Sequence, residues 1–242
     1  KDWTEFSVKI PYSENAERIY LGAILSGTGK LWVDDIQILL DGKDISEGKI
    51  KKPRQYKADL DTSFVGGSGI QSISLTKEKT SDLQLLGQVW GFLKYYHPSV
   101  AAGDYNWDNE LFRILPRVLA SKNSSERNSI LNRWVKGVGT TWPRANITKT
   151  DTIKLRPDFS WMNESALGKD LLASLNEIKE WDRPKVSYYI AMAPGVGNPQ
   201  FKNEKPYRSN AYEDIGIRLL CLYRYWNMIN YFFPYKNLID EN

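Results

Sequence analysis

The sequence predicts an α+β protein in which an N-terminal antiparallel β segment is followed by a mostly α-helical domain with a repeated aromatic helix. Apolar residues alternate along residues 1–45, as they do in strands, and recur with helical spacing after residue 80. The motif W-x-x-[LI]-x-Y-[YF]-x-P occurs twice, at Trp90–Pro98 and at Trp226–Pro234. A unit that is used twice is expected to bury its apolar face against something similar each time.

The composition fits a globular protein with enough apolar material for a core. Of the 242 residues, 41% are hydrophobic and 26% charged, and no apolar run is long enough to span a bilayer. The net charge of +4 is mild, and the densest basic run, Lys49–Arg54, contains a proline and has no aromatic platform beside it. These features favour a solvated linker over a nucleic-acid surface. Nine Trp and fourteen Tyr residues indicate either aromatic-rich packing or a sugar-facing surface.

Residues 1–45 are expected to form three short strands. Apolar side chains alternate in Phe6–Ile10 and in Ile19–Ala23, and a third apolar run covers Leu31–Leu40. Three strands are too few for a stable sandwich. We therefore expect either further strands before Lys1 or pairing with another surface.

Three segments follow the β segment. Residues 46–79 have the composition of a linker, and their glycine cluster, Gly66–Gly69, lacks the Lys-Ser/Thr pair of a phosphate loop. Residues 80–208 are expected to form a helical domain with one late strand. Residues 209–242 start a second copy of the helical unit, which we expect to be truncated before its own partner helix.

The first aromatic helix has clear start and stop signals. Ser81 and Gln84 fit a capping box, and Pro98 disfavours helical geometry at His97. The stripe expected to pack into the core consists of Leu86, Val89, Trp90, Leu93 and Tyr96.

The second aromatic helix is stopped in the same way by Pro234. Its corresponding stripe consists of Leu222, Tyr225, Trp226, Ile229 and Phe232. We expect Trp226 to be as buried as Trp90. The helix should either pack back onto the first copy of the helical repeat or leave an aromatic patch for another chain or domain.

Two further helices are expected in the first copy of the helical repeat. The stripe Trp107, Leu111, Ile114, Leu115 and Val118 predicts the earlier one. Pro116 should kink this helix, because the carbonyl of Phe112 loses its hydrogen-bond donor. The later helix is expected to start at Asn123 with Glu126 as its capping partner.

The remainder of the helical domain is less regular. Gly137 or Gly139 is expected to end the third helix, and apolar spacing over Leu167–Ile178 predicts a fourth. Alternation over 185–193 predicts a strand. The polar stretch 194–210 is expected to be a long loop, of a length that is usually functional or docked.

The segment Gly29–Ile38 has the form G-x-x-W-x-D-D-[IV]-x-[LI]. This form resembles the closing strand of jelly-roll carbohydrate-binding-like modules, which implies that residues 1–45 are the end of a partial jelly-roll-like module. Asp34 and Asp35 offer the hard oxygen ligands that calcium prefers. An acidic pair at a strand end that lies in solvent without an ion is the alternative.

Three longer motifs carry a second resemblance. They are L-G-Q-V-W-G-F-L-K-Y-Y-H-P, N-W-D-N-E-L-F-R-I-L-P and R-L-L-C-L-Y-R-Y-W-N-M-I-N-Y-F-F-P-Y-K-N-L-I-D-E. Together they resemble the N-terminal region of bacterial S41-family serine peptidases of the C-terminal-processing and tricorn-like group. The resemblance covers residues 60–242. It implies a peptidase domain beyond residue 242, with a serine nucleophile and a lysine general base, and a location in the cell envelope or outside the cell.

No residue of this chain is assigned to a catalytic, cofactor-binding or metal site. The family's serine motif has the form T-x-S-[AS]-[AS]-E, and the nearest match here is Asn123-Ser124-Ser125-Glu126. That match follows one helix and opens another, as a cap does. His97, the single histidine, is expected to be a polar helix terminus, and Cys221, the single cysteine, a small core residue. One histidine and one cysteine leave no zinc cluster.

The sequence therefore favours a non-catalytic scaffolding or regulatory region that packs against the peptidase domain of the same polypeptide. This chain alone is expected to hydrolyse no peptide bond, whereas the full-length protein would be a Ser-Lys peptidase. Two alternatives stay open. One is a carbohydrate-binding module based on Trp32, Asp34 and Asp35, and the other is a helical protein-interaction domain with no peptidase activity. The ligand would be a polypeptide or a glycan.

Overall fold

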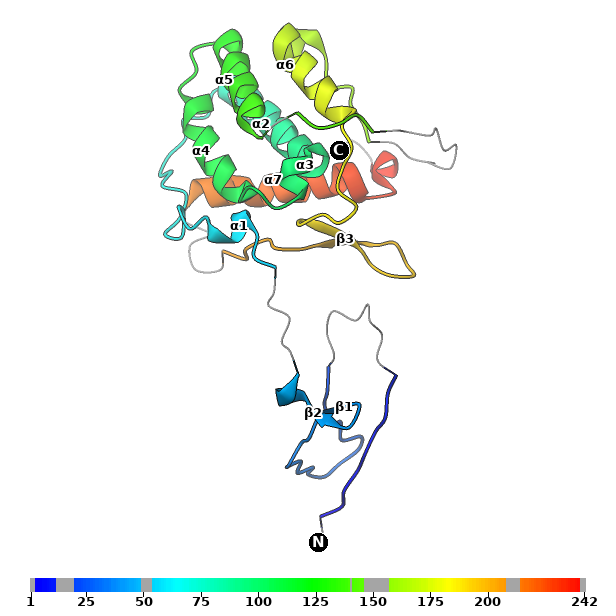
Figure 1. The fold of residues 1–242 in the computed structure, drawn as a ribbon. Helices are drawn as coiled ribbons and strands as arrows, with labels where there is room; N and C mark the ends of the chain where they lie inside the picture. Colours follow the sequence, from blue (N-terminus) through cyan, green and yellow to red (C-terminus); the bar gives the residue numbers. More distant parts are fainter. Residues whose placement is uncertain are drawn as a thin grey trace. The chain divides into compact units, whose positions relative to one another are not determined.

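The computed structural model describes most of the chain. The described residues are 3–11, 20–48, 54–139, 141–145, 157–207 and 214–239. The chain divides into two compact units, Lys1–Pro53 and Arg54–Asn242. The described residues form seven α-helices and two antiparallel two-stranded sheets, which confirms the predicted α+β class (Figure 1).

The first unit has one small hairpin. Strands β1 (Leu39–Leu40) and β2 (Lys43–Asp44) pair antiparallel. Asp41 and Gly42 join them with φ angles of 52° and 82°, the two left-handed positions of a type I′ turn. The side chain of Asp44 accepts a hydrogen bond from the backbone of Ser46 and so caps a 3-10 helix, η1 (Ile45–Glu47).

Of the three strands expected in this unit, only the end of the third run, Leu39–Leu40, forms a strand among the residues that the structure describes. Phe6–Ile10 and Leu31–Val33 have no strand partner, and their apolar side chains are exposed. Ile19 lies outside the described residues, and the alternating residues after it are not in a strand. Alternation describes a surface that fits a half-buried sheet. It does not supply the neighbouring strands that such a sheet requires.

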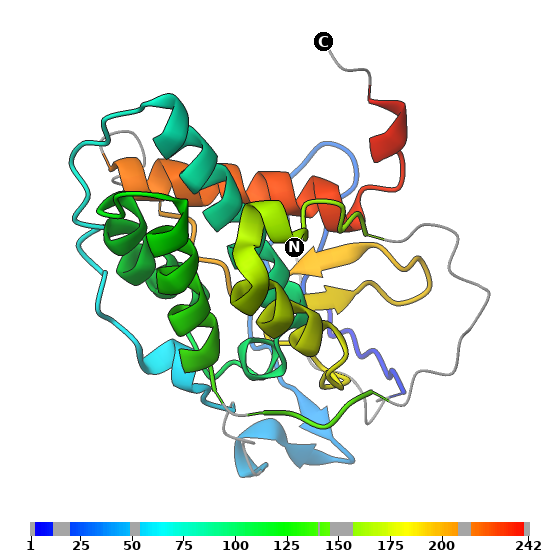
Figure 2. The ribbon, with the colours of Figure 1, turned by 90° about the horizontal axis from the view of Figure 1, so that it is seen from above.

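The second unit is built from helices around α2. The helices are α1 (Lys57–Leu60), α2 (Lys77–Tyr96), α3 (Pro98–Ala101), α4 (Trp107–Leu119), α5 (Ser124–Gly137), α6 (Glu164–Lys179) and α7 (Ile215–Phe232). A 3-10 helix, η2 (Lys236–Leu238), follows α7. Helices α4, α5 and α7 pack against α2, and α6 packs on α5 (Figures 1 and 2).

The core of this unit forms around α2. From Leu85 to Lys94 every residue of α2 except Gln88 is buried, and Tyr96 is partly buried. The predicted stripe is therefore confirmed at Leu86, Val89, Trp90 and Leu93, within a helix that is covered on almost all sides. The indole Nε1 of Trp90 donates to the Trp107 carbonyl at 2.9 Å, and the indole of Trp107 donates to the Trp90 carbonyl at 2.9 Å. These reciprocal bonds satisfy both buried indoles and attach α4 to α2.

Helix boundaries follow their caps. The start of α2 was predicted five residues too late, since Thr76 rather than Ser81 is the N-cap and accepts from the Lys79 amide at 3.2 Å. Its end at His97 is as predicted. The Asn123 cap of α5 is confirmed by a bond of 2.9 Å from the Glu126 amide. Helix α4 continues through the internal proline to Leu119, and α5 ends at Gly137.

The stretch expected to be a strand and then a structureless loop is a short hairpin. Strand β3 (Ile190–Met192) pairs antiparallel with β4 (Pro199–Phe201). The prediction of a loop was therefore wrong at β4, and the predicted strand over 185–193 was too long. The Ala193 amide donates to the Asn198 carbonyl at 2.8 Å, and this bond closes the connection between the two strands.

Helix α7 packs on α2 through a different face from the one predicted. Its buried residues are Gly216, Ile217, Leu220, Tyr223 and Asn227. Trp226 is 54% exposed, so the prediction that it is buried was wrong. The reason lies on α2, where a Cβ atom at Gly91 would be only 1.9 Å from Asn227 Oδ1. Glycine leaves room for a polar side chain, and that side chain decides how α7 is rotated.

Candidate functional site

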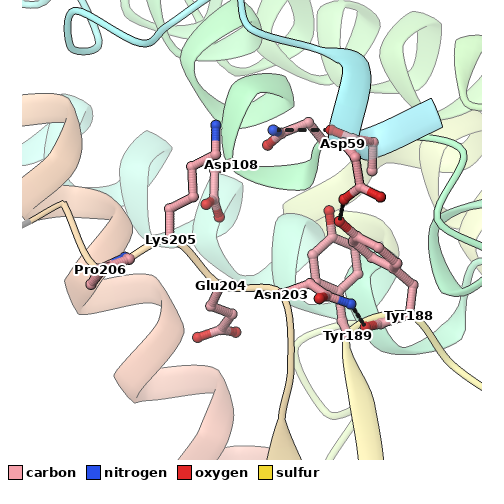
Figure 3. Close-up of a pocket in the computed structure, with 10 residues that line it drawn as sticks. Asp59, Asp108, Tyr188, Tyr189, Asn203, Glu204, Lys205 and Pro206 are labelled. Atoms are coloured by element: carbon pink, nitrogen blue, oxygen red, sulfur yellow. Dashed lines mark hydrogen bonds between the residues drawn. The ribbon is translucent and has the colours of Figure 1, made fainter. Parts of the chain in front are cut away.

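The second unit has a pocket of about 330 Å³ among its described residues. It lies between the α1–α4 region and the chain that follows β4 (Figure 3). It is lined by Ala58, Asp59, Asn106, Asp108, Tyr188, Tyr189, Asn203, Glu204, Lys205 and Pro206.

Two neighbouring tyrosines hold the pocket wall in place. The hydroxyl of Tyr188 donates to Asp59, and Asn203 Nδ2 donates to the Tyr188 carbonyl at 2.7 Å (Figure 3). The hydroxyl of Tyr189 accepts from the Trp107 amide and donates to the Tyr105 carbonyl, both at 2.8 Å. Burial raises the pKa of both phenols above the usual value, so they remain neutral donors.

Beside the pocket lies a buried set of charges, which we call the charge cluster: Lys94, Asp108, Glu204 and Arg224. The Lys94 ammonium is 1% exposed and forms an ion pair with Glu204. Arg224 Nη2 lies 2.5 Å from Asp108 Oδ2, and Tyr207 donates to the same carboxylate oxygen at 3.1 Å. Burial lowers the pKa of Lys94, while the negative charges of Glu204 and Asp108 oppose that shift.

The charge cluster joins parts of the chain that are far apart in sequence. It connects α2 through Lys94, α4 through Asp108, the segment after β4 through Glu204, and α7 through Arg224. Two cations face two anions, so the charges balance. Removing charges from water is costly unless each is paired and hydrogen-bonded. The arrangement fits a structural lock that fixes these four elements together.

The cluster does not have the geometry of a Ser-Lys catalytic pair. The hydrogen bond and ring contacts that Lys94 makes within the described residues are with Glu204, Trp90, Tyr95 and Tyr189. A general base must lie within hydrogen-bond reach of the hydroxyl that it activates. Ser124 and Ser125 lie in the exposed first turn of α5, beyond its Asn123 cap, as the sequence predicted.

His97 is a buried residue that caps a helix. Its side chain is 1% exposed, Nδ1 accepts from the Ser99 amide at 3.2 Å, and the ring packs edge-on against Trp181. The bond caps α3, so the expectation of a polar role at a helix end is correct. Burial lowers the pKa of His97 to about 4.

We expect the free energy of unfolding to fall as the pH drops from about 6.5 to about 4. In this window the unfolded chain protonates His97, whereas the folded protein keeps it neutral. The contribution is complete above the unfolded pKa and, for a shift to about 4, amounts to about 3 kcal/mol. Urea unfolding across this window measures it.

The matched variant is His97→Asn, because asparagine also accepts from a backbone amide at an N-cap but does not titrate. Carboxylates that titrate in the same window affect both proteins equally. The stability of the variant should therefore change less with pH, and parallel curves for the two proteins would contradict the assignment.

The acidic pair of the first unit has few partners. Asp34 accepts a hydrogen bond from the Asp35 amide at 2.8 Å. No group of three or more metal-binding side chains occurs in the ranges that the structure describes. Trp32 beside them is 75% exposed. In the same ranges, no helix has both the length and the apolarity to cross a membrane.

The second candidate site is the exposed side of α7. Leu222, Tyr225 and Trp226 are each more than half exposed and form what we call the α7 aromatic face. Cys221 next to them is also exposed, so the expectation that it is a small core residue was wrong. The signal that could have revealed this orientation is the Gly87 and Gly91 pair, since glycines one turn apart inside a helix indicate close approach of another element.

This aromatic face has no cover within the described residues, whereas both cations of the charge cluster are paired with carboxylates. Of the two sites, the face is therefore the one open to a further partner. Comparisons of the chain with protein-family models, with curated proteins and with solved structures each gave no match.

Proposed function

We propose that this chain is the non-catalytic N-terminal region of an S41-like serine peptidase, and that its helical unit packs against and positions a peptidase domain beyond residue 242. The three motifs that resemble this family lie on α2, α4 and α7, the helices that build the core. The same resemblance suggests a place in the cell envelope or outside the cell.

The observation that carries the proposal is the α7 aromatic face. An amphipathic helix is stabilised mainly by burial of its apolar side, yet Leu222, Tyr225 and Trp226 are exposed on a well-packed body. Contiguous exposed apolar residues mark interaction sites. The charge cluster holds α7 rigidly from behind, as a docking surface requires.

The test compares this chain with the full-length polypeptide in the hydrolysis of casein and fluorogenic peptides. This chain alone should give only the background rate, because it places no base beside a serine. The longer polypeptide should hydrolyse both substrates. Turnover by this chain that disappears in Ser124→Ala or Ser125→Ala would contradict the proposal.

Docking itself is tested with the full-length polypeptide. Leu222→Ser should weaken the coupling between the helical unit and the peptidase domain, seen as two separate unfolding transitions in calorimetry. The control is Val186→Ser, since Val186 is also highly exposed but lies away from α7 in sequence. A single transition in both variants would argue against docking through this face.

A second candidate function is glycan binding by the first unit. The observation that favours it is the exposed indole of Trp32, next to Asp34 and Asp35, because sugars stack on exposed aromatic rings. Titration with oligosaccharides should change the tryptophan fluorescence, and Trp32→Ala should abolish the change while Trp3→Ala keeps it. Absence of any saturable change would exclude this function for the sugars used.

A further inference from the structure

The two copies of the repeat lie against each other through equivalent positions. Residues one repeat apart differ by 136 in number, as Trp90 and Trp226 do. Gly87 meets its equivalent Tyr223, because a Cβ atom on Gly87 would be 2.6 Å from the Tyr223 ring. Gly91 meets its equivalent Asn227 in the same way.

A third equivalent pair extends this match by another helical turn. The rings of Tyr95 and Tyr231 lie 5.1 Å apart, edge to face. The pairs therefore advance together along both helices, so α2 and α7 run in the same direction and touch through the same face. Two patches that meet through equivalent positions imply an approximate two-fold axis between them. This axis relates the surroundings of α2 to those of α7.

On α2 the neighbouring face is buried, and α4 packs against it at Trp90. Leu86, Val89 and Trp90 are completely buried, and Trp90 exchanges two hydrogen bonds with Trp107, the first residue of α4. The rings of Trp90 and Trp107 are stacked, with centroids 6.5 Å apart.

On α7 the equivalent face is the α7 aromatic face, where Leu222, Tyr225 and Trp226 correspond to the three buried residues of α2. All three are exposed. The two-fold axis that exchanges α2 and α7 carries α4 onto this face. The open surface of α7 is thus equivalent to the surface of α2 on which α4 packs, and it fits a helix with the properties of α4.

The sequence after α7 follows the sequence after α2. A proline ends both helices, at Pro98 and Pro234, and a short helical turn follows in each copy, α3 in the first and η2 in the second. Asn106 is the N-cap of α4. Asn242 lies at the equivalent position, again 136 residues later.

We propose that the α7 aromatic face is covered by a helix of the same polypeptide that starts directly after Asn242 and has the chemistry of α4. Its first residue would be a tryptophan, followed by apolar residues at i+4, i+7, i+8 and i+11. The new indole would donate to the Trp226 carbonyl, and Trp226 Nε1 would donate to the carbonyl of the new tryptophan. The inference rests on the proposed function in that both place further chain after Asn242, and it narrows the part of that chain which contacts the α7 aromatic face to this one helix.

The test extends this chain by its natural continuation, far enough for one helix of the 13 residues that α4 has. Amide hydrogen exchange over residues 219–232 should slow about tenfold or more, because the extension closes an exposed helix. In parallel, a copy of residues 107–122 is attached after Asn242. Trp226→Ala should remove the protection in both proteins, whereas Val186→Ala should leave it unchanged.

The other outcomes separate the two proposals. If the short extension gives no protection but the full-length polypeptide does, the α4-like helix is wrong and docking of the peptidase domain stands. If neither protects residues 219–232, both proposals fall. If this chain alone forms a dimer that protects them, a second copy is the occupant and the inference is overturned. A continuation that lacks tryptophan at its first helical position also overturns it.

Discussion

Replacing Trp90 by alanine is expected to lower the free energy of unfolding by about 3–5 kcal/mol. The side chain is fully buried between α2, α4 and α7, so truncation leaves a cavity where the indole was. It also removes the hydrogen bond of 2.9 Å that the indole donates to the Trp107 carbonyl, and the loss of a buried hydrogen bond adds to the cost. Urea unfolding measures the change.

The matched variant is Trp226→Ala, which changes the same residue in the same motif. Because Trp226 is 54% exposed, its loss should cost at most about 1 kcal/mol in this chain. Equal losses for the two variants would show that the α7 aromatic face is covered in solution. A loss below about 1 kcal/mol for Trp90→Ala would contradict the core assignment.

The different fates of these two tryptophans show how far the repeated motif predicts the fold. The periodicity predicts both helices and both proline stops, and it predicts the buried face of α2 because that helix is covered on almost all sides. On α7 the same stripe is exposed. The contact is decided by Gly87 and Gly91 on the partner helix, and the pattern within one helix carries no information about its partner.

Sequence signals predicted the structure best where the interaction that they specify is made between residues close together in the chain. The Asn123 cap needs only the amide of Glu126, and it was predicted correctly. The start of α2 was missed because Thr76 competes with Ser81 as a cap, and the residues between them are acceptable in a helix. The Asp41-Gly42 dipeptide is a strong hairpin signal, and it marks the turn of the hairpin that the structure has in this unit.

The charge cluster was not predicted, because its members come from four separate elements. One signal was present in the sequence. The stretch Leu85–Leu93 is apolar on all sides, as in a central helix, so the next residue, Lys94, is expected to be buried as well. A buried lysine requires an anion. Which anion it pairs with depends on the tertiary fold, and Glu204 lies 110 residues away.

Replacing Glu204 by glutamine is expected to destabilise the protein by about 3 kcal/mol, because it leaves the Lys94 ammonium buried without its closest counter-ion. The side chain of Lys94 is 1% exposed, and burial already lowers the pKa of its ammonium group. Adding Lys94→Met to Glu204→Gln removes the orphaned charge, so the double variant should recover a large part of the loss.

The control is Lys57→Met, which breaks the exposed pair with Asp104 and should cost less than about 1 kcal/mol. A double-mutant cycle by urea unfolding measures the coupling. Additive losses in the double variant would show that Lys94 and Glu204 do not act as a pair, and the charge cluster would then not lock the segment after β4 onto α2.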